Sequence, residues 1–122
     1  MTDNYRHMNV EPQENAFCVL FSRQRMTEQD VLEMGDEIIQ LARTEDCPRI
    51  VFDFASSTPE CLFSVFLAKL VGLQKKLEEM GGGFRLCNCN EQVLGVFKAC
   101  RLDQVFSIYD SRQAALEDWK GA

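Results

Sequence analysis

The sequence is poor in the residues that catalysis most often requires. Its only histidine, His7, lies in a polar N-terminal arm, so a Ser/His or Cys/His centre would lack its base. We interpret His7 as a solvated surface residue. A phosphate-binding loop is also missing, because Gly81-Gly82-Gly83 follows a helical pattern and precedes a strand, with no lysine-serine pair after it. We therefore expect no enzymatic activity.

Long apolar runs and an excess of basic residues are missing as well. No stretch of about 18 apolar residues is present, and residues 1–15 lack the pattern of a signal peptide. A net charge of −6 disfavours unaided binding to nucleic acid or to an anionic membrane, since both need a basic surface. We expect a cytoplasmic protein whose partners are other proteins.

The six cysteines do not form the two close pairs of a structural zinc site. We expect all six to stay reduced and most of them to act as small buried hydrophobic residues, without a metal or other cofactor. Two of them, Cys87 and Cys89, are two residues apart in a predicted strand, so their side chains should share one face. The other four are Cys18, Cys47, Cys61 and Cys100.

Apolar periodicity and turn residues predict alternating strands and helices. Strands are expected over 16–22, 49–54, 84–89 and 105–109, with a short edge strand over 5–10 in the polar arm (1–15). Helices are expected over 28–43 after the Thr27 capping signature, from Ser64 to the glycine run, from the Asn90 cap, and from Asp110 with Gln113. This order predicts one α/β domain over 1–122, with a mixed, mainly parallel sheet of about four to five strands flanked by about four helices.

Apolar residues at helical spacing mark the faces expected to pack on the sheet. In chain order they are Val31, Met34, Ile38, Leu41 and Ala42; Phe66, Leu70, Leu73, Leu77 and Met80; Val93, Leu94, Phe97 and Cys100; and Ala115, Leu116 and Trp119.

Two polar residues near strand and helix ends are candidates for a site. Asp53 lies at the carboxyl end of an apolar strand, where parallel α/β sheets bind ligands. It has no base or metal partner in the pattern, so we favour hydrogen bonds to loop amides next to Ser56 or Ser57. Ser64 begins a helix, where it can act as an N-cap worth about 1 kcal/mol. A phosphate at that position would meet the free N–H groups and positive dipole end of the helix.

The segments RIVFDF (49–54), SVFLAKLVGLQKKLEEMGG (64–82), FRLCN (84–88) and RLDQVFSIYDS (101–111) resemble the STAS domain of bacterial anti-sigma factor antagonists. In that family an Asp-Ser-Ser-Gly-Leu-Gly motif opens the corresponding helix. The resemblance places Ser64 on the phosphorylated serine, with Leu67 and Ala68 on the Leu-Gly pair. Here Phe63 replaces the aspartate, Val65 the second serine and Phe66 the glycine, and the preceding loop is about two residues longer.

The resemblance implies a regulatory protein in signal transduction and transcription regulation. It would bind an anti-sigma factor serine kinase, free a sigma factor, and be released by phosphorylation at Ser64. The expected partner-binding residues are Asp53, Phe63, Ser64, Val65, Leu67 and Ala68. Burial is the default for Phe66, whereas Phe63 is the better candidate for an exposed docking residue.

Two alternatives remain open. The altered motif suits a non-phosphorylated STAS scaffold that assembles with a membrane or signalling complex through the helix from Ser64. A small-ligand or lipid sensor would instead use a pocket near Asp53. The oligomeric state, including a homodimer, also remains open.

Overall fold

The computed structural model describes residues 5–22, 25–54, 64–117 and 119. In these residues the elements follow one another in the order β1 (Met8–Pro12), β2 (Phe17–Phe21), α1 (Glu28–Thr44), β3 (Arg49–Asp53), α2 (Ser64–Glu79), β4 (Gly83–Cys87), α3 (Glu91–Ala99), the 3-10 helix η1 (Leu102–Gln104), β5 (Ser107–Tyr109) and α4 (Arg112–Glu117). This confirms the predicted α/β class.

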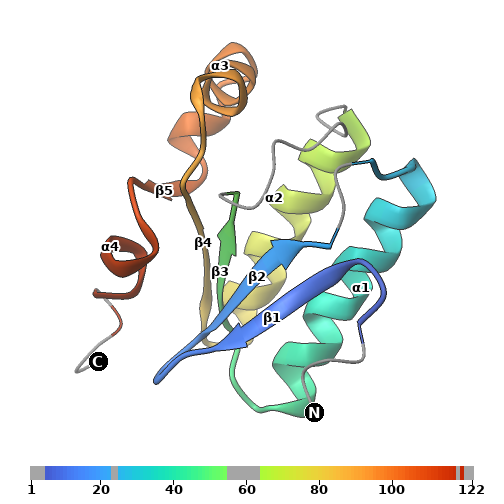
Figure 1. The fold of residues 1–122 in the computed structure, drawn as a ribbon, viewed down its shortest axis with the longest axis vertical. Coiled ribbons are helices and arrows are strands. Elements are labelled where there is room, and N and C mark those ends of the chain that lie inside the picture. Colours follow the sequence, from blue (N-terminus) through green and yellow to red (C-terminus); the bar gives the residue numbers. More distant parts are fainter. Residues whose placement is uncertain (1–4, 23–24, 55–63, 118, 120–122) are drawn as a thin grey trace.

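The five strands form one mixed sheet in the order β1-β2-β3-β4-β5 (Figure 1). The β1–β2 pair is antiparallel, and the other three pairs are parallel. Parallel neighbours require crossover helices, which α1, α2 and α3 supply. The expected edge strand is therefore real, although it covers 8–12 rather than 5–10.

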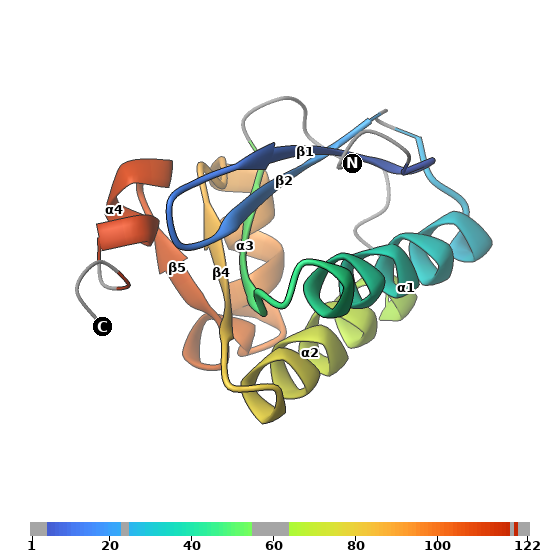
Figure 2. The ribbon, with the colours of Figure 1, turned by 90° about the horizontal axis from the view of Figure 1, so that it is seen from below.

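The two faces of the sheet are covered unequally. One face packs against α1, α2 and α3 and forms the larger hydrophobic cluster, which includes Phe52, Phe66 and Phe97. In Figures 1 and 2, α1 and α2 run side by side beneath this face. Among the helices of the described residues, only α4 covers the opposite face, where its Ala115 packs with Cys18 and other buried residues in a small second cluster.

Local sequence explains where most helices begin and end. The Thr27 hydroxyl accepts from the Asp30 N–H, and the Asp30 carboxylate accepts from the Thr27 N–H, a complete capping box for α1. The Asn90 side chain accepts from the Val93 N–H and caps α3. For α4 the predicted Asp110 start was wrong by one residue, since the Ser111 hydroxyl accepts from the Ala114 N–H.

The predicted core faces are mostly correct. All five α1 residues and the four predicted residues within α2 are buried, whereas Met80, which follows the end of α2, is half-buried. Leu94 and Leu116 are half-buried. Cys100 is exposed, contrary to prediction, because α3 ends at Ala99 and Cys100 is its C-cap.

The paired placement of Cys87 and Cys89 was also wrong. Strand β4 ends at Cys87, and Asn88 then takes a left-handed conformation with φ of 58°. The alternation of a strand stops at that residue. Cys87 therefore packs in the small cluster under α4, whereas Cys89 packs against the larger cluster.

Candidate functional site

The candidate switch residue Ser64 is exposed and is the first residue of α2. The first N–H groups of a helix have no partner within it, and the positive end of the helix dipole lies there. The first turn of α2 contains no acidic residue that would repel an added phosphate. Chemically, this position can carry a phosphate or contact an anionic group of a partner.

The other expected contact residues on α2 differ in exposure. Ala68, one turn beyond Ser64, is exposed, and Val65 is half-buried against the core. Leu67 is 9 % exposed and belongs to the larger hydrophobic cluster. Phe63, together with Ser56 and Ser57, lies outside the described residues.

Sequence reasoning missed Gly72, which continues the exposed face of α2. Ser64, Ala68 and Gly72 are exposed at four-residue intervals, so they lie on one side of the helix. A Cβ atom added at Gly72 would meet nothing within 4 Å. We call these three residues the small-residue face of α2. The signal was the spacing of small residues four apart on the side opposite the apolar stripe.

Asp53 is 2 % exposed and is held by side chains far away in the sequence. Its Oδ2 accepts from Nη2 of Arg112 at 2.8 Å and from Nε at 3.1 Å, and its Oδ1 accepts from Nδ2 of Asn88 at 3.0 Å. Arg112 also donates to Glu11 of β1. This carboxylate therefore ties the end of β3 to the β4–α3 turn and to α4, and the site residues that sequence reasoning missed here are Asn88 and Arg112.

Electrostatics keep this arginine charged. Burial lowers the pKa of Arg112, but hydrogen bonds to Glu11 and Asp53 outweigh burial, and the net pKa is raised. A buried carboxylate needs such a partner, because an unpaired buried charge is costly. An open pocket of about 420 Å³ lies beside Arg112 and is lined by Gln13, Arg112, Gln113 and Leu116.

A second arginine secures α4 on the same face of the sheet. Arg85 lies over the Trp119 ring at 3.8 Å and near the Tyr109 ring at 5.4 Å. Its Nη1 donates to the Ala115 carbonyl at 2.7 Å. These cation–π and hydrogen-bond contacts compensate for the small apolar area that a six-residue helix can bury.

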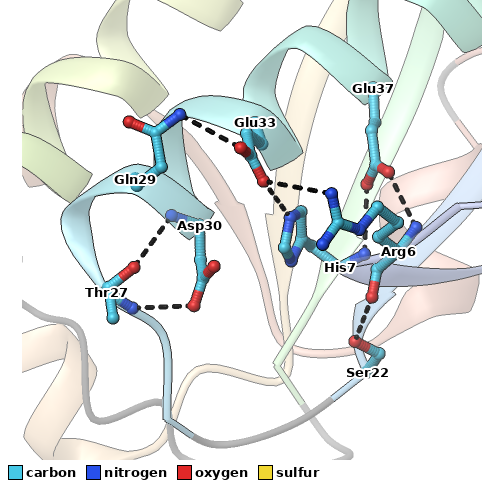
Figure 3. A network of polar contacts seen from close by, with 8 residues as sticks. All are labelled: Arg6, His7, Ser22, Thr27, Gln29, Asp30, Glu33 and Glu37. Carbon is cyan, nitrogen blue, oxygen red and sulfur yellow. Dashed lines mark hydrogen bonds and ion pairs between the residues drawn. The ribbon is translucent and has the colours of Figure 1, made fainter.

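The interpretation of His7 as a solvated residue was wrong. Its side chain is 2 % exposed, and its Nε2 lies 2.8 Å from Oε1 of Glu33 (Figure 3). The Glu37 carboxylate accepts the backbone N–H of Arg6 at 2.7 Å and that of His7 at 3.2 Å. Consecutive turns of α1 thus hold the segment that enters β1, which local sequence could not reveal.

The contacts around His7 also change the pKa of Glu33. A hydrogen bond from Gln29 and then one from His7 lower the pKa of its carboxyl group. In the described part of the chain, one ring nitrogen of His7 and one carboxylate oxygen each of Asp30 and Glu33 lie within 4.8 Å of one another.

The described cysteines divide by environment. Burial raises the pKa of Cys18 to about 11 and that of Cys87 and Cys89 to about 12. These thiols stay protonated at neutral pH and are poor nucleophiles or metal ligands. They serve as packing residues, as the sequence predicted, while Cys61 lies outside the described residues.

No helix in the described part of the chain is long and apolar enough to cross a membrane.

Comparison with known proteins finds similarity both in sequence and in fold. A Thermotoga neapolitana protein that is named as an anti-sigma factor antagonist and TM1081 homolog is 35 % identical over 65 residues, which are 53 % of this chain. The chain spans 58 % of the length of that relative.

Two solved structures show the same fold at low identity. A Thermotoga maritima anti-sigma factor antagonist has a TM-score of 0.75 at 20 % identity, over 91 % of this chain and 92 % of its own. The Bacillus cell fate determinant SpoIIAA in its phosphorylated form has a TM-score of 0.66 at 14 % identity, over 93 % of this chain and 99 % of its own.

The family model of the STAS domain matches residues 33–115, from the middle of α1 into α4. That range includes Asp53, Ser64, Asn88 and Arg112. The chain therefore belongs to the STAS domain family.

Proposed function

We propose that this protein is a non-enzymatic anti-sigma factor antagonist that binds an anti-sigma serine kinase through the start of α2. The observation that carries the proposal is the exposed Ser64 as the first residue of α2 in a STAS domain. By this proposal the protein acts in the cytoplasm and frees a sigma factor when it engages the kinase. Phosphorylation of Ser64 then ends the interaction.

The contact surface would centre on the small-residue face of α2. Side chains of this size let a partner approach the helix backbone closely, and Phe63 would add an aromatic anchor beside them. Leu67 and Asp53 are buried, so in this proposal they act from beneath the surface, by holding α2 and the end of β3 in place.

Phosphate at Ser64 has opposite effects on the free protein and on the complex. In the free protein the added charge is favourable, because it faces the helix N-terminus without a nearby acidic residue in the first turn. In the complex the same charge would have to lose its water inside an interface, which weakens binding. The likeness to SpoIIAA, whose phosphorylated form has been solved, supports this route at the level of the fold.

The test uses a purified anti-sigma serine kinase from the same genome, with ATP and magnesium. Intact-mass measurement should show one added phosphate, peptide mapping should place it on Ser64, and Ser64→Ala should remove it. Ser107→Ala is the matched control, because Ser107 is also exposed but lies in β5, and it should leave phosphorylation unchanged. Phosphate on another residue, or a tight complex in which none is transferred, would contradict the switch.

A STAS scaffold without phosphorylation is the second candidate, favoured by Phe63 and Val65 at positions where the family has aspartate and serine. In that case Ser64→Ala and the wild-type protein bind the partner equally, while Phe63→Asp weakens binding. An unchanged affinity in Phe63→Asp would remove the scaffold candidate.

A further inference from the structure

His7, Asp30 and Glu33, which we call the His7 cluster, join the segment before β1 to the first two turns of α1 (Figure 3). None of the three belongs to α2 or to the Asp53–Arg112 pair. The cluster therefore stands apart from the residues that the proposed function uses. One imidazole from the segment before β1 and two carboxylates from α1 make a donor set different from an ordinary acidic surface patch.

The geometry of the cluster is close to what a small metal ion requires. Its ligand atoms lie within 4.8 Å of one another, and the imidazole Nε2 and the Glu33 Oε1 are already 2.8 Å apart. Asp30 and Glu33 are three residues apart on α1, so both carboxylates lie on one side of the helix. Two ligand atoms at bonds of about 2.0–2.2 Å from a tetrahedral Zn²⁺ ion lie about 3.3–3.6 Å apart, so the Glu33 oxygen would move slightly away from the imidazole when the ion binds.

Residues outside the cluster orient each ligand. Gln29 Nε2 donates to Oε2 of Glu33 at 3.0 Å, and the Thr27 N–H donates to Oδ2 of Asp30 at 3.0 Å. The Glu37 carboxylate holds the backbone just before the His7 Cα through the N–H groups of Arg6 and His7. Outer contacts of this kind fix the orientation of metal ligands and raise affinity.

Burial of the imidazole adds to the case. His7 is 2 % exposed, whereas Glu33 is half-buried, so the cluster has a dry side formed by the imidazole and a wet side that an ion can reach. We propose that the His7 cluster binds a divalent transition-metal ion of the Zn²⁺ class, with one nitrogen ligand, two carboxylate oxygens and water. One nitrogen with two oxygens suits Zn²⁺ or Co²⁺ better than Ca²⁺ or Mg²⁺, which prefer oxygen alone.

Binding replaces a hydrogen bond with a metal bond. In the metal-free protein the imidazole and Glu33 share a hydrogen bond. In the metal-bound protein Nε2 gives its lone pair to the ion, and the ring hydrogen of the neutral imidazole is carried on Nδ1. The ion then ties residue 7 to α1 and stabilises the edge of the sheet at β1.

One cation already competes for the cluster. Nη1 of Arg6 lies 3.9 Å from Oε1 of Glu33, and this arginine side chain is 78 % exposed. Removing it should strengthen metal binding, because the Arg6 contact with Glu37 uses the backbone N–H and survives truncation. A purely structural His7–Glu33 contact gives no reason for that gain.

The test is titration of the reduced full-length protein with Co²⁺, followed by visible absorption and by thermal unfolding. We expect one Co²⁺ per chain, a spectrum of nitrogen and oxygen ligands, and a higher unfolding temperature. Glu33→Gln and Asp30→Asn should each weaken binding at least tenfold, and Arg6→Ala should strengthen it. Glu28→Gln, an exposed acid on the first turn of α1, is the matched control and should change nothing.

Thermal unfolding without metal checks that each variant is folded. Glu33→Gln and Asp30→Asn give two independent measurements of the change in Co²⁺ affinity. Three results would overturn the proposal: no saturable binding, a thiolate-to-cobalt charge-transfer band that assigns the ion to cysteine, or equal affinity in wild-type, Glu33→Gln and Asp30→Asn proteins.

Discussion

The two ends of α2 are built in opposite ways. At its carboxyl end the chain passes through Gly81, Gly82 and Gly83 against neighbouring backbone and Trp119. At its amino end the exposed side is made of small residues, and Ser64 faces solvent. The apolar side of the same helix is buried along its length. A helix held in this way can carry a chemical change at its first residue without losing its position.

The carboxyl end is fixed by hydrogen bonds and by close packing. Gly82 N–H donates to the Leu77 carbonyl at 2.9 Å and Gly81 N–H to the Glu78 carbonyl at 3.0 Å, while Gly81 has φ of 92°. This pattern is the Schellman motif. Gly83 N–H then donates to the Pro48 carbonyl at 3.1 Å, which ties the turn to the start of β3.

The largest effect should come from one methyl group at the fixed end. In Gly82→Ala the new Cβ would collide with the Pro48 carbonyl and lie 2.7 Å from its Cβ. Pro48 cannot move away without shifting the backbone that enters β3, so we expect a loss of about 1–3 kcal/mol in the free energy of unfolding. Urea denaturation measures it, and wild-type stability in this variant would show that the end of α2 is not fixed.

A methyl group added on the exposed side of α2 should instead raise the free energy of unfolding. Gly72→Ala adds a Cβ that meets nothing within 4 Å, on a helix where alanine is favoured over glycine. We expect a gain of up to about 1 kcal/mol in the same urea experiment. A loss of stability at Gly72 would contradict the view that this side of α2 is open.

Local signals in the sequence were sufficient for most of the fold. The Thr27 and Asn90 caps, the glycine stop after α2 and the apolar stripe through Phe66 all act within a few residues, and the structure confirms each. Strands that alternate with helices of crossover length then predict parallel pairing.

The contacts that sequence reasoning missed join residues that are far apart in the sequence. The Asp53–Arg112 pair spans 59 residues and the His7–Glu33 contact spans 26, so no local pattern reveals either. The residues next to His7 in the sequence are polar, which led to the prediction of a solvated side chain. In the structure Glu33 and Glu37 of α1 bind this segment. The Cys87–Cys89 error arose from the left-handed Asn88, one residue that ends the strand alternation.

The central claim is that the start of α2 is a surface where charge controls binding and leaves folding intact. It is tested most directly by isothermal titration of an anti-sigma serine kinase with Ser64→Glu, alongside urea denaturation of the same variant. Ser107→Glu, at an exposed position of β5, is the matched control and should behave as wild type. We predict that Ser64→Glu lowers affinity at least tenfold, a change of about 1.4 kcal/mol or more. Its free energy of unfolding should stay within about 1 kcal/mol of wild type, since a negative charge at a helix N-terminus is mildly stabilising. Unchanged affinity, or a loss of affinity matched by a loss of stability, would contradict the account.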